Sequence, residues 1–144
     1  MKNKNKQVII LRGVSGAGKS TFVKKNYPNA EVVSADFYFT KNGEYKFDPK
    51  QLTSAHKECF GQFEFLLENG AKLIVVDNTN TRLWEFDRYI GLTEEYGYQV
   101  NVIRLNPNWE IAADRNTHGV LKNNVQAMND RMEPYEGEKV LTNY

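Results

Sequence analysis

The sequence feature that most constrains this chain is a glycine-rich segment at residues 13–21, directly after the apolar run at residues 8–11. Its spacing is G-x-x-x-x-G-K-[ST]. The glycines let successive backbone N–H groups turn inward around a phosphate chain, because no Cβ obstructs them. Lys19 can then reach the β- and γ-phosphates, and the Ser20 hydroxyl is placed to hold Mg²⁺. The segment is a P-loop, and we expect ATP to be bound by Gly13, Ser15, Gly16, Ala17, Gly18, Lys19, Ser20 and Thr21.

Apolar strand patterns alternate with helical patterns along the rest of the chain. We expect strands near residues 8–11, 31–34, 72–76 and 99–104, with helices near 19–26, 49–68, 82–96, 109–116 and 122–132. This order predicts an α/β fold, a central parallel sheet flanked by helices, with a helical lid near residues 109–132. Because ligands of such sheets bind at the carboxyl ends of the strands, the P-loop, Asp36 and Asp77 should line one cleft.

Length and composition predict a single domain over residues 1–144, with a flexible basic arm at 1–6 and a surface tail at 135–144. A formal net charge of +1 excludes a protein coated in nucleic acid or held on an anionic membrane. Cys59 is the only cysteine, so no disulfide forms within the chain, and a reducing, cytoplasmic location is expected. Cys59 lies on the apolar face of a predicted helix, which favours a core thiol over a nucleophile.

Phosphoryl transfer needs phosphate binding, a metal, a base and cations near the transferred oxygens. Asp36 follows a predicted strand and is the candidate base, with a loop-capping role as the alternative. Asp77 ends the strand at 72–76 and is a candidate Mg²⁺ ligand, although residues 77–80 also fit a hydrogen-bonded turn. Arg115 precedes the break at His118 and is a candidate lid arginine, with a solvated helical arginine as the alternative. His118 fits a hinge better than a catalyst.

Four separated motifs resemble the P-loop kinase domain of bacteriophage polynucleotide 5′-kinases, and more closely the small kinase domains of the Nedd-four-binding-protein-two-like family. They are the P-loop, residues 34–38 (SADFY), residues 77–80 (DNTN) and residues 114–120 (DRNTHGV). The closer likeness to the second family comes from residues 43–49 (GEYKFDP), 55–56 (AH) and 77–81 (DNTNT). The likeness covers residues 7–134. It implies an ATP- and Mg²⁺-dependent transfer of the γ-phosphate to a 5′-hydroxyl, with Lys19 and Ser20 at the nucleotide, Asp36 as general base and Arg115 as lid arginine.

The acceptor side departs from the phage pattern. Phe39 stands where the phage kinases carry an arginine, and Asp77 comes one position earlier than their acid. We expect Asp36, Phe39, Asn78 and Arg82 to contact the acceptor, with Phe39 stacking on the base of an unpaired 5′-hydroxyl end of RNA or DNA. Two alternatives stay open, a kinase of a small hydroxylated molecule such as a nucleoside, and an ATP-binding regulatory module without turnover. The sequence does not specify the oligomeric state.

Overall fold

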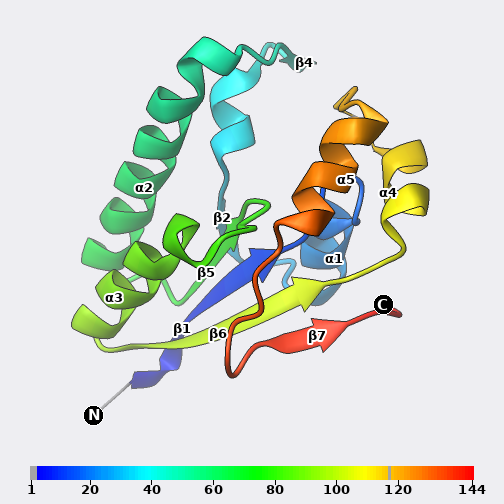
Figure 1. Ribbon diagram of the computed structural model, residues 1–144. Coiled ribbons are helices and arrows are strands. Elements are labelled where there is room, and N and C mark those ends of the chain that lie inside the picture. The colour runs from blue at the N-terminus through cyan, green and yellow to red at the C-terminus, as the bar shows by residue number, and fades with distance from the viewer. Residues whose placement is uncertain (1–2, 117) are drawn as a thin grey trace.

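The computed structural model describes residues 3–116 and 118–144, and its centre is a five-stranded parallel sheet (Figure 1). The strands are β1 (Asn3–Arg12), β2 (Glu31–Val33), β5 (Leu73–Asp77), β6 (Tyr98–Leu105) and β7 (Lys139–Leu141). Their order across the sheet is β2-β5-β1-β6-β7, and each neighbouring pair is parallel. The predicted α/β fold with a central parallel sheet is therefore confirmed.

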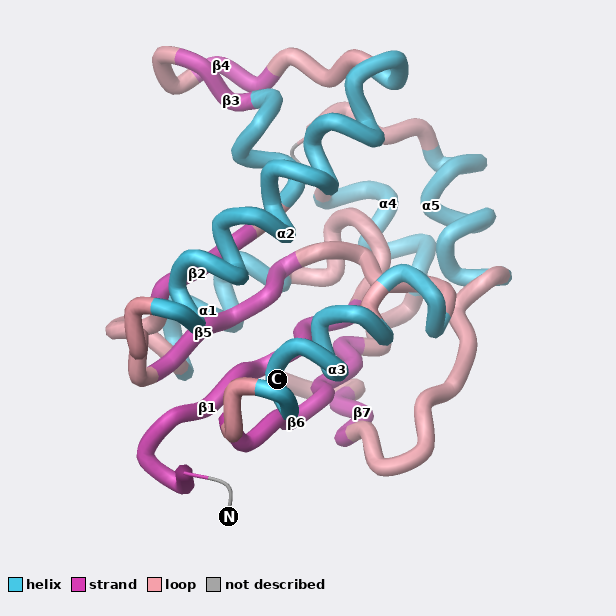
Figure 2. Tube along the Cα trace, turned by 90° about the vertical axis from the view of Figure 1, so that its left-hand side faces the viewer, coloured by secondary structure: helices cyan, strands magenta, loops and turns pink. Residues whose placement is uncertain are grey.

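Helices cover both faces of this sheet, because β1 is apolar on both sides. Val8 and Ile10 pack with α2 (Leu52–Glu68) and α3 (Asp87–Glu95), whereas Ile9 and Leu11 pack with the opposite layer. That layer is formed by α1 (Lys19–Asn26), α4 (Trp109–Arg115) and α5 (Lys122–Asp130). Figure 2 shows α2 and α3 together in front of the sheet. A strand buried on both faces reads as a continuous apolar run, as residues 8–11 do.

Short elements fill the connections at the carboxyl edge of the sheet. They are the 3-10 turns η1 (Ala35–Phe39), η2 (Pro49–Gln51) and η3 (Leu83–Glu85), and the hairpin of β3 (Thr40–Lys41) and β4 (Glu44–Tyr45). The hairpin projects at the top of Figure 2. The helix predicted over residues 82–96 is interrupted at Phe86, whose φ of −130° leaves the helical region and whose ring is fully buried. Cys59 is a buried thiol, as predicted.

Both predicted chain ends differ from the structure. Residues 3–6 belong to β1, and Asn3 pairs with Tyr98 of β6, so the arm predicted over residues 1–6 is wrong from residue 3 onward. Residues 1 and 2 lie outside the described part of the chain. The tail predicted at 135–144 is also wrong, because β7 pairs with β6 at the sheet edge. No helix among the described residues has the length and apolarity to cross a bilayer.

The physical reason for the ordered carboxyl-terminal segment is a buried cation at the end of β1. Arg12 is fully buried, and its guanidinium donates to the carboxylate of Glu138 at 2.7 Å. It also donates to the backbone carbonyls of Asn80 at 2.8 Å, Thr81 at 3.0 Å and Glu133 at 2.6 Å. Burial lowers the pKa of Arg12, and the Glu138 carboxylate opposes that shift. One side chain thus joins β1 to the segment after β5, to the end of the lid and to the segment leading into β7.

We expect Arg12→Met to lower the free energy of unfolding by about 3–5 kcal/mol, because it leaves the buried Glu138 carboxylate and three carbonyls without their donor. Urea unfolding followed by circular dichroism measures this. Lys46→Met is the matched control, since Lys46 lies 3.5 Å from Glu44 with both side chains at least 70% exposed. Such a surface pair contributes about 0–1 kcal/mol. A midpoint for Arg12→Met equal to that of the control would contradict this account.

Candidate active site

The P-loop joins β1 to α1, and it leaves the first N–H groups of α1 available for a ligand. Gly18 is the N-cap of α1, with φ of 90°, and no side chain caps the helix there. Uncapped N–H groups and the helix dipole together favour a bound anion. The backbone of this loop therefore has the donors that a phosphate chain requires.

Lys19 is the first residue of α1, and its ammonium turns back onto the P-loop. Its Nζ donates to the carbonyls of Gly13 at 2.9 Å and Val14 at 3.1 Å. Burial lowers the pKa of Lys19, while the charges of Asp77 and Asp36 act in the opposite direction. The lysine predicted from the motif is therefore close to both acids predicted from the strand ends.

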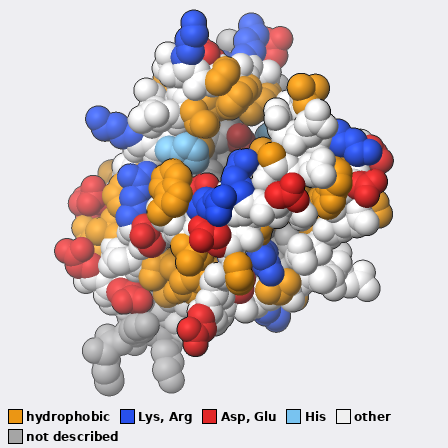
Figure 3. All heavy atoms as spheres, viewed as in Figure 1, with side chains coloured by type: hydrophobic (Ala, Val, Ile, Leu, Met, Phe, Trp, Pro, Cys, Tyr) orange, Lys and Arg blue, Asp and Glu red, His pale blue; other side chains and the backbone are white. Residues whose placement is uncertain are grey.

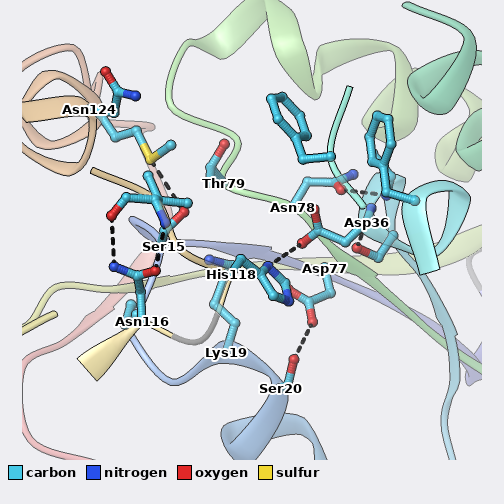
Figure 4. Close-up of a pocket in the computed structure, with 18 of the residues that line it drawn as sticks. Ser15, Lys19, Ser20, Asp36, Asp77, Asn78, Thr79, Asn116, His118 and Asn124 are labelled. Atoms are coloured by element: carbon cyan, nitrogen blue, oxygen red, sulfur yellow. Dashed lines mark hydrogen bonds and ion pairs between the residues drawn. The ribbon is translucent and has the colours of Figure 1, made fainter. Parts of the chain in front are cut away.

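Asp77 ends β5 next to the P-loop strand, where it pairs with Leu11 of β1. Its carboxylate oxygen lies 3.5 Å from the Ser20 hydroxyl, as Figure 4 shows, and it is 8% exposed. Burial raises the pKa of Asp77, and the nearby Lys19 charge opposes this. Magnesium prefers oxygen ligands and takes few of them from protein when nucleotide phosphates supply the rest. The two oxygens at Ser20 and Asp77 fit such an ion, and no cluster of three or more His, Cys, Asp or Glu side chains occurs among the described residues.

Asp36 lies just after β2 and presents its carboxylate to the same cavity. The cap of η1 is Ser34, whose hydroxyl accepts the N–H of Asp36 at 3.2 Å, so the Asp36 side chain is not the cap. The carboxylate is 51% exposed and lies 3.6 Å from Nδ1 of His118 and 3.5 Å from the hydroxyl of Tyr45. This arrangement leaves the carboxylate accessible to an acceptor hydroxyl.

His118 and Tyr45 are a pair that the sequence analysis did not find. Their rings stack with centroids 4.1 Å apart and an angle of 8° between planes. Burial, followed by the Asp36 carboxylate, raises the pKa of Tyr45 to about 12, which keeps its hydroxyl protonated near neutral pH. His118 was predicted as a hinge residue next to Thr117, which lies outside the described residues. The structure instead places its imidazole against Asp36, where Figure 4 shows the contact.

The predicted lid helices pack directly on the P-loop. Arg115 donates from Nε to the carbonyl of Gly16 at 2.6 Å and from Nη2 to that of Ala17 at 3.3 Å. Gly16 has φ of 83°, and a Cβ there would lie 1.9 Å from the carbonyl oxygen of Ala112 in α4. On the other side of the loop, the hydroxyl of Ser15 lies 3.6 Å from the sulfur of Met128 in α5. The arginine thus lies at the rim of the phosphate loop, where the resemblance implied a lid arginine.

The carboxyl-terminal segment also reaches this loop. The hydroxyl of Tyr144 donates to the carbonyl of Ala17, and its ring lies 6.0 Å from that of Phe22 in α1. The sequence analysis had placed Tyr144 in a surface tail. Because β7 runs parallel to β6, its carboxyl end lies at the same edge of the sheet as the P-loop.

Two of the residues expected at the acceptor, Phe39 and Asn78, line the cavity but are largely buried. Phe39 is 5% exposed and packs with Ala55. Asn78 accepts the N–H of Ala35 at 2.9 Å and lies 3.6 Å from the sulfur of Cys59, so its amide links β2 and α2 to β5. Arg82 is exposed and is not among the described residues that line the cavity. The burial of Phe39 leaves little of its ring to stack on a base, so its role at the acceptor stays a prediction.

One cavity of about 1680 Å³ runs from the P-loop past Asp36 to η3, and its lining includes Lys19, Ser20, Asp36, Tyr45, Asp77, Arg115 and His118. Pockets for a single small ligand are about 300–1,000 Å³, so this cavity has room for a nucleotide and a second molecule. Figure 3 shows the hollow on the face turned to the viewer, with hydrophobic, basic and histidine side chains around it. Further residues that line it are His56, Lys57, Trp84, Arg88 and Arg131, and of these only His56 lies in a motif used in the sequence analysis.

Comparison with known proteins supports the same assignment of fold. A family model described as "AAA domain" matches residues 8–134. Human NEDD4-binding protein 2 is 31% identical over 141 residues, which cover 93% of this chain and 8% of that protein. The chain therefore spans less than a tenth of that relative.

Two solved structures show the fold at lower identity. A chain of the Pnkp1/Rnl/Hen1 RNA repair complex matches with a TM-score of 0.71 and 18% identity, over 91% of this chain and 45% of that one. The APS kinase CysC of Mycobacterium tuberculosis matches with a TM-score of 0.64 and 14% identity, over 97% and 90% of the two chains. This P-loop kinase-type fold implies nucleotide binding.

We expect Lys19→Ala to raise the dissociation constant for ATP by about 10- to 100-fold, since charge-assisted hydrogen bonds contribute about 1.5–3 kcal/mol. Isothermal titration calorimetry measures it. Lys24→Ala, an exposed lysine in the last turn of the same helix, is the control and should bind ATP as the parent does. Equal ATP affinities of the two variants would show that Lys19 does not bind the phosphates.

Proposed function

This chain belongs to the AAA-domain family, whose model covers residues 8–134, and from that premise we propose that it is an ATP-dependent polynucleotide 5′-hydroxyl kinase. It transfers the γ-phosphate of ATP to a 5′-hydroxyl end of RNA or DNA. The observation that carries the proposal is the half-exposed carboxylate of Asp36 in the same cavity as Lys19. A base for an acceptor hydroxyl and a cation for the phosphates thus share one enclosed space.

On the nucleotide side, the P-loop backbone and Lys19 bind the phosphates, with Lys19 exchanging its carbonyl partners for phosphate oxygens. Ser20 and Asp77 would hold Mg²⁺, because their oxygens lie 3.5 Å apart beside the loop. Bound there, Mg²⁺ supplies positive charge to the phosphate oxygens. The burial that raises the pKa of Asp77 also weakens competition from water for its carboxylate.

On the acceptor side, Asp36 accepts the proton of the 5′-hydroxyl. The oxygen then forms a bond to the γ-phosphorus, and the bond from that phosphorus to the β–γ bridging oxygen breaks, so that ADP leaves with the electron pair. Arg115 donates to the oxygens of the transferred group after it leaves the carbonyls of Gly16 and Ala17. Positioned donors of this kind act on charge that develops in the transition state. The reach of one arginine from rim to phosphate needs only a change of side-chain conformation.

The relatives support a nucleic-acid acceptor, although none is identical enough to transfer its activity. One solved structure of the same fold belongs to an RNA repair complex, and another is an APS kinase, which is a kinase of a small molecule. The size of the cavity favours the larger acceptor. The Asp36 carboxylate is accessible and does not serve as a helix cap. This favours a catalyst over a regulatory module, because a regulatory module needs no base for an acceptor hydroxyl.

The test incubates the parent protein and the Asp36→Asn variant with γ-labelled ATP. Parallel reactions contain 5′-hydroxyl oligonucleotides, nucleosides or buffer alone as the acceptor. We expect label on the oligonucleotides, with turnover in Asp36→Asn lower by about 10² or more and ATP affinity within a few-fold. The control Asp48→Asn changes a carboxylate that only caps η2 and should keep its turnover. Label on nucleosides alone would identify a small-molecule kinase, and no label on any acceptor would favour a regulatory module.

We further expect Arg115→Ala to slow the chemical step by about 10²–10³ in single-turnover kinetics, because it removes a donor that acts mainly in the transition state. Lys122→Ala is the control. It removes an exposed lysine of the neighbouring helix α5, whose ammonium lies 4.0 Å from the carboxylate of Glu110. A chemical step in Arg115→Ala as fast as in the control would leave Arg115 a solvated residue of α4.

A further inference from the structure

Two exposed aromatic side chains at the acceptor end of the cavity have no role in the account above. Phe37 in η1 is 58% exposed and Trp84 in η3 is 72% exposed, and both line the cavity. These elements follow β2 and β5, which are neighbours in the sheet. Phe37 follows Asp36 directly. The segment that leads into η3 contacts the start of the P-loop and the end of the lid, because Gly13 donates to the carbonyl of Thr79 at 3.1 Å and the N–H of Leu83 donates to the carboxylate of Glu133 at 3.1 Å. Exposed apolar side chains gathered at a hollow are typical of a binding surface.

Basic side chains line the same part of the cavity. Lys57 is exposed on α2, and Arg88 is exposed on α3, where its guanidinium lies 4.4 Å from the ring centre of Phe60. Besides Asp36, the proposed base, Glu85 is an acid that lines this cavity. It accepts from the hydroxyl and the N–H of Thr81 at 2.8 and 3.1 Å, so its oxygens are already bonded. The open end of the cavity therefore combines aromatic rings with positive charge.

We propose that Phe37 and Trp84 stack successive unpaired bases at the 5′ end of a nucleic-acid acceptor, while Lys57 and Arg88 contact its phosphates; this inference rests on the kinase function proposed above. Rings that accept base faces, together with cations along the backbone, are the features of single-strand binding sites. In a duplex only the outer face of the terminal base pair is exposed, so successive bases have no free faces for two protein rings. The site therefore selects unpaired ends.

The positions of the two rings also set the length of the acceptor. Phe37 follows Asp36 directly, so its base is that of the nucleotide whose 5′-hydroxyl is phosphorylated. Trp84 belongs to a different connection, after β5, and takes a base further along the strand. A dinucleotide or longer strand thus fills both positions, whereas a nucleoside fills one. Because every base has an aromatic face, the site tolerates base identity.

The kinetic test measures KM for a single-stranded 5′-hydroxyl oligonucleotide in Phe37→Ala and Trp84→Ala. We expect each KM to rise by about 5- to 100-fold, with KM for ATP unchanged and kcat within a few-fold. Phe65→Ala is the matched control, because its ring is also 58% exposed, on α2, but is not among the described residues that line the cavity. Equal KM values for all three variants would overturn the proposal.

A second readout follows binding without turnover. The chain has two tryptophans, so Trp109→Phe leaves Trp84 as the only indole, and Trp84→Phe leaves Trp109. If the base stacks on Trp84, the oligonucleotide should quench the tryptophan fluorescence of Trp109→Phe in a saturable way. It should not quench the fluorescence of Trp84→Phe. Quenching without phosphorylation would contradict the kinase function and keep the stacking site. Phosphorylation with no quenching and unchanged KM would contradict the stacking site and keep the kinase function.

The cationic part of the proposal has its own control. Arg88→Gln should weaken oligonucleotide binding and reduce the slope of its salt dependence by about 1, since one phosphate contact is lost. Arg82→Gln removes an exposed arginine a few residues earlier, outside the lining of the cavity, and should change neither. The opposite pattern would assign the acceptor to Arg82, as the sequence alone had suggested.

Discussion

The interaction on which the rest of this structure depends is the buried guanidinium of Arg12 at the end of β1. It fixes two carbonyls after β5, one carbonyl at the end of the lid and the carboxylate of Glu138. The next residue, Gly13, begins the P-loop and donates its N–H to the carbonyl of Thr79 at 3.1 Å. Asn80, held in the left-handed region at φ of 48°, donates in turn to the carbonyl of Leu11 at 2.9 Å. The start of the phosphate loop is therefore positioned by segments about seventy and one hundred and twenty residues away, which the guanidinium draws together.

Two acceptors compete for the cationic donors of this site, the P-loop carbonyls and the oxygens of a bound phosphate. Lys19 and Arg115 both donate to P-loop carbonyls, and phosphate oxygens would compete for the same N–H groups. The exchange favours phosphate because a charged acceptor forms a stronger bond with a cation than a carbonyl does. It also relieves Lys19, whose pKa burial lowers, by adding negative charge beside it. Both cations therefore already lie against the loop that is proposed to bind the phosphates.

Local patterns predicted the parts of this molecule that depend on local chemistry. The glycine spacing located the P-loop, and the rule that strands end at one edge correctly brought Lys19, Asp36 and Asp77 to a single cavity. The pattern could not show β7, since two of its three residues are exposed and its anchor, Glu138, binds an arginine 126 positions earlier. Nor could it choose between Phe37 and Phe39, because a single 3-10 turn gives no periodicity from which to tell the buried ring from the exposed one. Contacts between residues far apart in the sequence decide both outcomes: Arg12 with Glu138 for the segment leading into β7, and Ala55 with Phe39 for the buried ring.

The order of the strands also arranges the chemistry in space. In-line transfer requires the attacking and leaving oxygens to lie on opposite sides of the phosphorus. Across the sheet, β2 delivers Asp36 and Phe37, β5 delivers Asp77, and β1 delivers the P-loop with Lys19, in that spatial order. The acceptor elements therefore lie on one side of Asp77 and the nucleotide elements on the other. The stack of Tyr45 on His118 then links the acceptor-side hairpin to the lid across this line, directly beside the proposed base. In the proposed kinase reaction, a parallel sheet with this strand order would hold the acceptor and the nucleotide on opposite sides of Asp77, with the transferred phosphoryl group between them.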